Sequence, residues 1–336
     1  MIINDKEIKG GYPPYIVAEA SCNHGGYLDN ALSLIDAAKY AGADAVKFQA
    51  YTPDTITLNC NKPDFIIQEG LWKGRNLYEL YGKTHTPFEW FPKLFKHAKK
   101  IGITLFASVF DRTSVDMLRK LDCPAYKIAS MEIGDIPLIK YAALSNKPMI
   151  ISTGMADFTE VRAALEACDS TNVAFLHCTS EYPGTVEWAD LSRMLLMKVF
   201  LGQDAVIGVS DHTPPGSTIV PIAATTLCAA IIEKHLRLDD VITEDAEFSI
   251  TPESFKLMVN LTKVTNEAIR VREFVSNPSR QMRRSLYAVA DIKKGDSFSE
   301  DNIRSIRPGY GIAPKNLPRL LGRKADQNYR KGDRIT

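Results

Sequence analysis

Several features that the chain lacks exclude whole classes of protein. The 336 residues contain no hydrophobic run that approaches the roughly 18 residues needed to span a bilayer. The first residues, Met1 to Glu7, lack the apolar core of a signal peptide. Lysine and arginine are spread along the chain and the net charge is only +1, so the basic cluster typical of nucleic-acid-binding proteins is missing too. These absences predict a cytoplasmic protein that binds neither a membrane nor nucleic acid.

Two further motifs are missing. The six cysteines are widely spaced and form no Cys-x-x-Cys pair, which argues against a zinc knuckle and against a small disulfide scaffold. No Gly-x-Gly-x-x-Gly turn follows the first predicted strand, so a dinucleotide-binding open sheet is not indicated. What the chain does have is 45% apolar and 24% charged residues, which is the composition of an ordinary globular protein.

One unit is repeated through the first 274 residues: a short apolar run that ends on a polar residue, followed by an amphipathic helix. Strands that alternate with helices at this spacing favour a closed parallel (β/α)8 TIM barrel over an open sheet. An insertion over residues 53–86 delays the second helix, and we expect short helices in it near residues 65–67 and 77–80. The eight predicted strands are residues 15–18, 45–49, 103–108, 125–129, 148–151, 173–178, 205–209 and 229–232.

The pattern changes after the last predicted helix, residues 255–274. We therefore expect a barrel domain over 1–274, a linker over 275–284 and a small β-rich domain over 285–336. In the small domain, Lys-Gly-Asp occurs twice, as part of an internal repeat of a turn that leads into a strand. A domain of about 50 residues is only marginally stable by itself, so we expect it to pack against a barrel, either that of its own chain or that of a neighbouring chain.

Two predicted strands lead directly into a histidine. The run 205–209 is followed by Ser-Asp-His, which ends at His212, and the run 229–232 is followed by Glu-Lys-His, which ends at His235. The carboxyl ends of barrel strands open on the active-site face, so these imidazoles could share one divalent metal, with Asp211 alongside. Alternatively, each histidine is only hydrogen-bonded at the barrel rim.

Other polar residues collect at the same predicted rim. Two of them, Glu19 and Glu132, are candidates for proton transfer, because a carboxylate beside a metal and an anion can have its pKa shifted in either direction. The sequence leaves that direction open. The remaining candidates, in chain order, are Lys47, Gln49, Ser108, Lys127, Ser130, Ser152, Ser180, Tyr182 and Ser210.

Lys47 and Lys127 stand out because they lie on the second and fourth predicted strands, and alternate strands form one layer of a barrel interior. Two ammonium groups at one height need a multivalent anion, and the nearby serine hydroxyls are donors that a phosphate or carboxylate would accept. The alternative is that each lysine reaches solvent or pairs with Glu19 or Glu132.

Ordered motifs over the whole barrel resemble the sialic acid synthase family. The tail, with Ile-Lys-Lys-Gly-Asp at 292–296 and Ile-Arg-Pro-Gly at 306–309, resembles the antifreeze-like (SAF) domain of that family. Three segments of and near the insertion, 52–58, 64–72 and 77–81, most resemble the pseudaminic acid synthases. The barrel motifs are residues 16–19, 23–24, 46–49, 126–132, 151–155, 177–183, 210–213 and 233–235.

The resemblance implies an activity. Phosphoenolpyruvate would condense with the open-chain aldehyde of an N-acetylated amino sugar, with release of phosphate and formation of a nine-carbon 2-keto sugar acid. For a pseudaminic acid synthase the sugar is a 2,4-diacetamido-2,4,6-trideoxy hexose of the altrose type. N-acetylneuraminate and legionaminate synthases of the same family are the alternatives.

The resemblance also implies roles for residues. His212 and His235 would hold a divalent metal, for which manganese, cobalt and magnesium are candidates, and Glu132 would transfer protons around the tetrahedral intermediate. Arg307 would reach an acetamido oxygen in the partner subunit of a domain-swapped homodimer. Glu19, Gln49, Tyr182 and Asp245 would face the sugar, and phosphoenolpyruvate would bind Lys47, Ser108, Lys127, Ser130, Ser152 and Ser210, with Ser180 as a further substrate-binding candidate.

Two other functions are compatible with the same residues. A barrel aldolase would use Lys127 or Lys47 as the nucleophile of a Schiff base. A non-enzymatic carbohydrate-binding protein would instead work through its tail.

Overall fold

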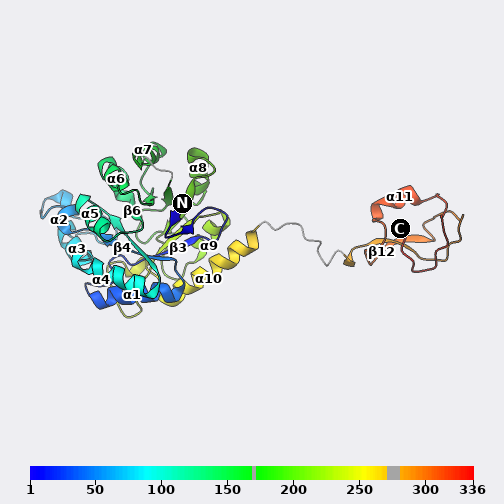
Figure 1. Ribbon diagram of the computed structural model, residues 1–336, viewed down its shortest axis with the longest axis horizontal. Coiled ribbons are helices and arrows are strands. Elements are labelled where there is room, and N and C mark those ends of the chain that lie inside the picture. The colour runs from blue at the N-terminus through cyan, green and yellow to red at the C-terminus, as the bar shows by residue number, and fades with distance from the viewer. Residues whose placement is uncertain (169–171, 271–280) are drawn as a thin grey trace. The chain divides into compact units, whose positions relative to one another are not determined.

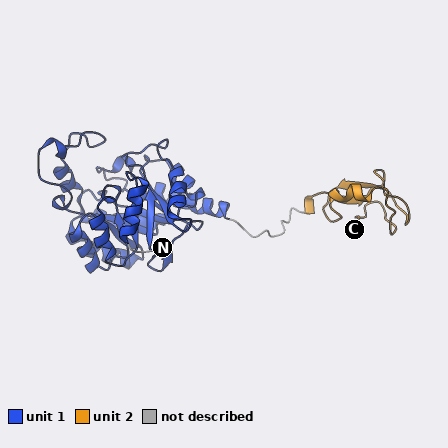
Figure 2. Ribbon diagram, turned by 90° about the horizontal axis from the view of Figure 1, so that it is seen from above, with its two compact units in different colours: residues 1–270 blue, residues 271–336 orange. Residues whose placement is uncertain are grey.

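The computed structural model describes residues 1–168, 172–270 and 281–336. The chain divides into two compact units, Met1–Arg270 and Val271–Thr336, which are coloured separately in Figure 2. Most of the linker predicted over 275–284 falls outside the described residues, as does the end of the last predicted helix.

The first unit is a closed barrel of eight parallel strands, all of them within the described residues. Neighbouring strands pair in chain order, and β10 closes the barrel by pairing with both β9 and β3. The predicted fold and all eight predicted strands are thereby confirmed. The strands are β3 (Tyr15–Glu19), β4 (Ala45–Ala50), β5 (Thr104–Val109), β6 (Tyr126–Ile128), β7 (Met149–Ser152), β8 (Val173–His177), β9 (Val206–Asp211) and β10 (Ile231–His235).

A helix follows each of these strands in the described part of the chain, and the helices surround the barrel (Figure 1). In the last of them, residues 252–269, buried residues recur at positions 255, 258, 259, 262 and 266. They form one stripe that packs against the helices over residues 28–41 and 219–226. The helices are α1 (Leu28–Ala41), α4 (Phe91–Ile101), α5 (Arg112–Lys120), α6 (Ile136–Ala143), α7 (Phe158–Cys168), α8 (Ser192–Leu201), α9 (Ile219–Thr226) and α10 (Pro252–Ile269).

The barrel strands are buried on both faces, because helices cover the outside and side chains fill the inside. This explains why the strands read as nearly continuous apolar runs in the sequence. The polar exceptions gather at the strands' carboxyl ends, so the sequence concentrates its buried polar groups at one end of the barrel.

The insertion after β4 folds as short helices rather than as an open loop. Its elements are α2 (Pro53–Ile56), the 3-10 turn η1 (Pro63–Phe65), α3 (Leu77–Thr84) and the turn η2 (Phe88–Trp90) that leads into α4. Asn76 caps α3, because its side-chain oxygen accepts hydrogen bonds from the backbone N–H groups of Tyr78 and Glu79. A small hairpin that sequence reasoning did not predict, β1 (Ile2–Ile3) and β2 (Lys6–Glu7), precedes the barrel.

The second unit contains a hydrophobic core of its own, built from residues such as Leu286, Phe298 and Tyr329. Its regular elements are the antiparallel pair β11 (Ser285–Ala288) and β12 (Ile303–Ile306), the turn η6 (Pro314–Asn316) and the short helix α11 (Leu317–Leu320). The two halves of the predicted repeat adopt the same turn: the N–H of Lys293 donates to Asp296, and the N–H of Arg330 donates to Asp333. Both turns need a glycine with a φ of 94°.

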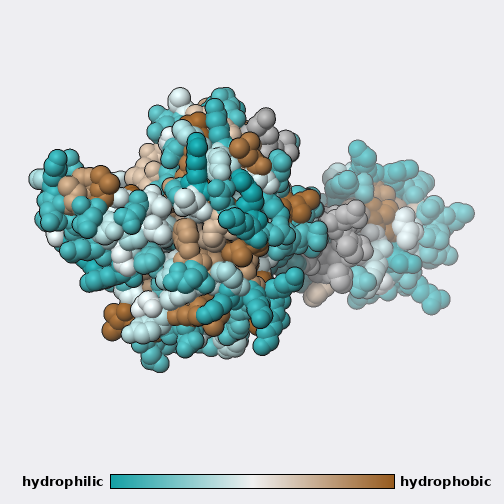
Figure 3. Space-filling model, turned by 60° about the vertical axis from the view of Figure 1, so that its left-hand side comes forward, coloured by the Kyte–Doolittle hydropathy of each residue, from teal (hydrophilic) through white to brown (hydrophobic). Residues whose placement is uncertain are grey.

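Polar residues cover most of the surface seen in Figure 3, and apolar residues form small separate patches there. Single exposed apolar side chains such as Trp188 are normal for a globular protein. Among the described residues, no helix combines the length and the apolar composition that crossing a bilayer requires.

Candidate functional site

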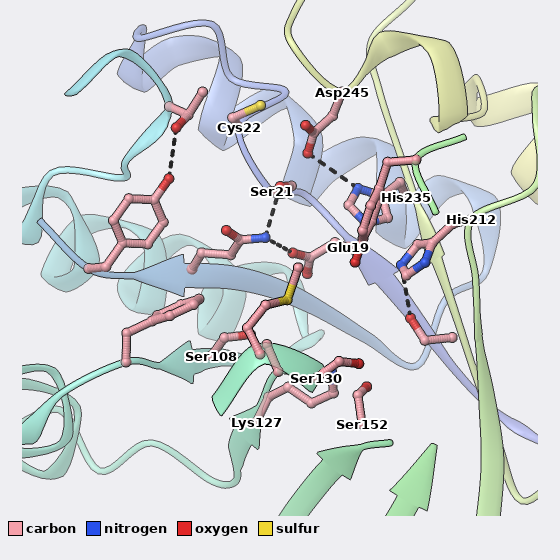
Figure 4. A pocket seen from close by; sticks show the side chains of 18 of the residues that line it. Glu19, Ser21, Cys22, Ser108, Lys127, Ser130, Ser152, His212, His235 and Asp245 are labelled. Atoms are coloured by element: carbon pink, nitrogen blue, oxygen red, sulfur yellow. Dashed lines mark hydrogen bonds and ion pairs between the residues drawn. The ribbon is translucent and has the colours of Figure 1, made fainter. Parts of the chain in front are cut away.

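A cavity of about 390 Å³ opens at the carboxyl ends of the barrel strands. Figure 4 shows Lys127 and three serines on one side of it, the two histidines and Asp245 on another, and Glu19 between them. The structure therefore brings together most of the predicted site residues. Those that line the cavity are Glu19, Lys47, Gln49, Ser108, Lys127, Ser130, Glu132, Ser152, Tyr182, Ser210, His212, His235 and Asp245.

Glu233, on β10, joins the two lysines. Its Oε1 atom lies 3.0 Å from Nζ of Lys47 and 3.5 Å from Nζ of Lys127, and it accepts a 2.9 Å hydrogen bond from the Ser210 hydroxyl. Burial opposes ionisation of Glu233, but the two ammonium groups outweigh it and hold its pKa below the ordinary value. The lysines thus lie at one height of the barrel, as the layer argument predicted, with a carboxylate between them.

The two lysines have different environments. Lys47 also lies 3.3 Å from Glu19, and although burial lowers its pKa, Glu19 and Glu233 together raise it above the ordinary value. Burial lowers the pKa of Lys127, and Glu233 offsets only part of that shift. Pairing with Glu19, which was the alternative considered from the sequence, is therefore found for Lys47, while the prominent partner of both lysines is Glu233.

The carboxyls of Glu19 and Glu132 both have a raised pKa. Burial raises the pKa of Glu19 to about 7 although Lys47 opposes the rise, and Gln49 donates a 2.8 Å hydrogen bond to this carboxyl. Burial likewise raises the pKa of Glu132 to about 7, against the pull of Lys127. The Oε2 atom of Glu132 is buried without a hydrogen-bond partner. A carboxyl with a pKa near 7 can both give and take a proton at neutral pH.

The rings of His212 and His235 lie with their centroids 5.4 Å apart at the end of β9 and β10. The Nδ1 atom of His212 donates a 2.8 Å hydrogen bond to the carbonyl of Thr179, which leaves the lone pair on Nε2. Burial lowers the pKa of His212 to about 4 and that of His235 well below its ordinary value. Both imidazoles are therefore neutral, which is the form that ligates a metal.

A metal bound here would need ligands from outside the protein. Among the described residues, no group of three or more His, Cys, Asp or Glu side chains is arranged to hold an ion. The carboxylate of Asp245 lies beside the pair: its Oδ2 is 3.6 Å from Nδ1 of His235, which has no hydrogen-bond partner among the described residues. Two neutral imidazoles that face a cavity fit a metal whose other ligands are water or substrate.

A buried asparagine holds the loop that carries Asp245. Asn23 donates hydrogen bonds to the carbonyl of Leu236 (2.9 Å) and to the hydroxyl of Ser249 (2.8 Å), and it accepts one from Thr243. Ser249 in turn donates to the backbone carbonyl of Asp245 (2.6 Å). Since Asn23 and Ser249 are both fully buried, this network fixes the loop against the barrel.

Asp211 does not support the histidine pair, which corrects the argument made from the sequence. Its carboxylate accepts hydrogen bonds from Lys234 (2.8 Å) and from both the N–H and the hydroxyl of Thr213, and it does not line the cavity. The reason is the two-residue period of a strand, which turns Asp211 and Lys234 to the opposite face from their neighbours His212 and Glu233.

One predicted site residue of the barrel unit, Ser180, does not line the cavity. Its hydroxyl is buried, has no hydrogen-bond partner among the described residues and lies close to Gly154, where an added Cβ atom would be 2.3 Å from it. Arg307 belongs to the second unit and directly follows β12.

Sequence reasoning named neither Glu233 nor Trp72 as a site residue. The layer argument that singled out the lysines could have found Glu233, because it lies on the eighth strand and thus in the same layer of alternate strands. Trp72 lines the cavity and also packs on Tyr182 and Phe248. No local pattern could have placed it there, since the insertion has to fold back over the barrel first.

Comparison with known proteins fits this site. Residues 34–273 match the NeuB family, and residues 283–336 match the SAF domain. The chain belongs to the NeuB family. The pseudaminic acid synthase of Campylobacter jejuni is 41% identical over 329 residues, which cover 96% of this chain and 95% of that protein. The pseudaminic acid synthase of Helicobacter pylori is 42% identical over 324 residues, 94% of each chain.

Solved structures agree with this assignment to the NeuB family. The N-acetylneuraminic acid synthetase of Leptospira borgpetersenii, determined in complex with citrate, is 30% identical and superposes with a TM-score of 0.72. The match covers 84% of this chain and 93% of that one. The predicted family and the predicted SAF domain are both confirmed.

Proposed function

We propose that this NeuB-family protein is a pseudaminic acid synthase. It condenses phosphoenolpyruvate with the open-chain form of a 2,4-diacetamido-2,4,6-trideoxy hexose of the altrose type. Carbon 3 of phosphoenolpyruvate bonds to the aldehyde carbon, water adds at carbon 2, and phosphate leaves, which yields a nine-carbon 2-keto sugar acid. The observation that carries the proposal is the buried pair of lysines beside two neutral histidines, in a chain 41% identical to a pseudaminic acid synthase.

The lysine side of the cavity would bind phosphoenolpyruvate. Lys47 and Lys127 offer two ammonium groups, of which Glu233 neutralises one. The charge of the second is only partly balanced, because burial raises the pKa of Glu19 to about 7. A phosphate or carboxylate would complete the balance. Hydroxyl donors for it stand around the lysines at Ser108, Ser130, Ser152 and Ser210.

The sugar would lie between the histidines and Glu132. Tyr182 packs on His212 at a centroid distance of 4.3 Å, and Gln49 and Asp245 line the same part of the cavity. Glu132, whose Oε2 has no hydrogen-bond partner among the described residues, would accept the proton of the attacking water and return one to the developing alcohol.

His212 and His235 would hold the divalent metal that the family resemblance implies, with manganese, cobalt and magnesium as candidates. Such an ion would polarise the aldehyde oxygen and stabilise the negative charge that develops on it. The residues' own contribution is to stay neutral and correctly oriented: burial depresses the pKa of both rings, and the Thr179 carbonyl fixes the tautomer of His212.

Arg307 would complete the sugar site from the partner subunit of a domain-swapped homodimer. The proposal rests on the family resemblance around Arg307 and on the small size of the second unit. If it is right, mixing an inactive Lys127→Ala chain with an inactive Arg307→Ala chain and refolding them together restores part of the activity. No recovery, with mixed dimers confirmed by native mass spectrometry, would remove Arg307 from the shared site.

We place the enzyme in the cytoplasm, where phosphoenolpyruvate is made.

The choice among sugars can be tested directly. Phosphate release is measured with phosphoenolpyruvate and, in turn, the altrose-type diacetamido sugar, the precursor of legionaminic acid and N-acetylmannosamine. The proposal predicts the highest kcat/KM for the first. A preference for either of the others would make the chain a legionaminate or an N-acetylneuraminate synthase.

A further inference from the structure

One side of the cavity is apolar and has no role in the chemistry described above. Its side chains come from a single part of the chain, the insertion between β4 and α4. We call this set the apolar wall: Ile56, Ile67, Trp72, Leu80 and Tyr81. The charged side of the cavity, in contrast, comes from the barrel strands.

The apolar wall is held in place by backbone hydrogen bonds and by an ion pair. Residues 67–75 form a loop that two backbone hydrogen bonds close. The N–H of Ile67 donates to the carbonyl of Arg75 (2.9 Å), and the N–H of Gly74 donates to the carbonyl of Ile67 (2.8 Å). Arg75 also forms a 2.6 Å ion pair with Glu244, the residue before Asp245. The wall is therefore tied to the loop that faces the sugar.

Trp72 lies at the centre of this arrangement. Its ring packs on Tyr182 at 6.1 Å and meets Phe248 edge to face at 6.3 Å, and Tyr182 in turn packs on His212. One ring, that of Tyr182, therefore separates Trp72 from His212. The indole Nε1 is buried and has no hydrogen-bond partner, although a buried N–H normally has one.

We propose that the apolar wall is the subsite that distinguishes a diacetamido-trideoxy hexose from N-acetylmannosamine. Besides the difference in configuration between altrose and mannose, the two sugars differ in two substituents. Carbon 4 carries an acetamido group or a hydroxyl, and carbon 6 is a methyl or a hydroxymethyl group. The apolar wall packs on the methyl groups, and Trp72 Nε1–H donates to the carbonyl oxygen of the second acetamido group. The inference rests on the proposed function, because it concerns the sugar of that reaction.

The expected discrimination follows from the chemistry of the subsite. A hydrophobic pocket separates substrates that differ by one methylene by about 10- to 200-fold, and it rejects an added hydroxyl by about 100-fold. A donor left without its acceptor adds to the penalty for the wrong sugar. The wall should therefore act on the choice of sugar and not on phosphoenolpyruvate.

The test compares Trp72→Ala and Trp72→Phe with the wild type on both sugars. Trp72→Phe keeps an apolar ring and removes the N–H, so it separates packing from hydrogen bonding. We expect kcat/KM for the diacetamido sugar to fall about 10- to 100-fold in Trp72→Ala and by less in Trp72→Phe. The value for N-acetylmannosamine and the KM for phosphoenolpyruvate should change little. Where turnover of N-acetylmannosamine is too slow, its inhibition constant against the diacetamido sugar replaces it.

Trp188→Ala is the matched control, because this tryptophan is 68% exposed and does not line the cavity. It should leave both sugars unaffected. An equal fall for both sugars in Trp72→Ala, or no fall for either, would overturn the subsite. Failure of the proposed function looks different, since then the wild type itself releases no phosphate with the diacetamido sugar.

Discussion

The two sides of the cavity differ in origin and in chemistry. The ends of the barrel strands supply Lys47, Lys127, Glu233 and both histidines, all of which are buried and ionisable. The insertion over residues 53–86 supplies an apolar wall that is tied down by Arg75. The difference teaches that one fold can separate its tasks: rigid strands position the reacting groups, and an inserted segment sets which sugar fits.

Replacing the histidines should cause the largest loss of activity. His212→Ala and His235→Ala each remove a proposed metal ligand, and with it the stabilisation of the negative charge that develops on the aldehyde oxygen. The activation barrier should rise by several kcal/mol, so phosphate release should fall by about 10²- to 10⁴-fold with every sugar. Metal content per chain, measured by native mass spectrometry after chelation and repletion, should fall as well. His97→Ala, on the surface of α4, is the control. Near-normal turnover in either variant would remove the metal assignment.

Two buried carboxylates of neighbouring strands allow a sharper comparison. Glu233→Gln removes the carboxylate shared by both lysines and leaves Lys47 with Glu19 alone, and Asp211→Asn removes the ion-pair partner of Lys234 on the other face of the strand. Each should cost about 3–5 kcal/mol of stability, since a buried charge loses its partner. Thermal melts with and without phosphate then separate them. Phosphate should raise the melting temperature of Asp211→Asn by as much as that of the wild type, and that of Glu233→Gln by clearly more, because a bound phosphate then replaces the missing carboxylate.

An equal rise in the melting temperature of these two variants with phosphate would contradict the proposal that the anion binds at Lys47 and Lys127. So would a loss of activity per folded molecule in Asp211→Asn, because Asp211 lies outside the cavity.

The lysines should affect one substrate more than the other. Lys47→Ala and Lys127→Ala each remove a charge-assisted contact worth about 1.5–3 kcal/mol, so the KM for phosphoenolpyruvate should rise about 10- to 100-fold. The KM for the sugar should change much less. Steady-state kinetics with each substrate varied in turn measures both, and Lys147→Ala, which only loses a surface ion pair with Asp122, is the control. If the sugar constant moved instead, the strand side would bind the other substrate.

The smallest effect concerns Glu132 and pH. Burial raises its folded pKa to about 7 from an ordinary value of 4.5, while Lys127 opposes and Asp135 supports the rise. The folded state therefore holds the proton more tightly than the unfolded state, and the wild type loses stability as pH rises from 4.5 to 7. Glu132→Gln cannot ionise, so its melting temperature relative to the wild type should increase over this range. A difference that stays constant with pH would show that Glu132 titrates normally.

The sequence predicted the strand side of the site far better than the insertion side. A two-residue period, a barrel rule and a run of polar residues at strand ends were enough to find Lys47, Lys127 and both histidines. The same period, had it been applied to Asp211, would have turned that residue away from the cavity. Trp72 could not be placed, because its position depends on a turn, an ion pair to Glu244 and ring contacts that form only in the folded protein.

The central claim is that the buried lysines bind an anion and do not form a covalent bond with the substrate. Lys127 makes this worth testing, because burial lowers its pKa as a Schiff-base lysine would require. The measurement is to incubate the wild type with phosphoenolpyruvate and the diacetamido sugar, add borohydride, and record released phosphate and the mass of the chain. We predict one phosphate for each nine-carbon acid formed and an unchanged protein mass. A borohydride-trapped adduct on Lys127 or Lys47, without phosphate release, would contradict the account.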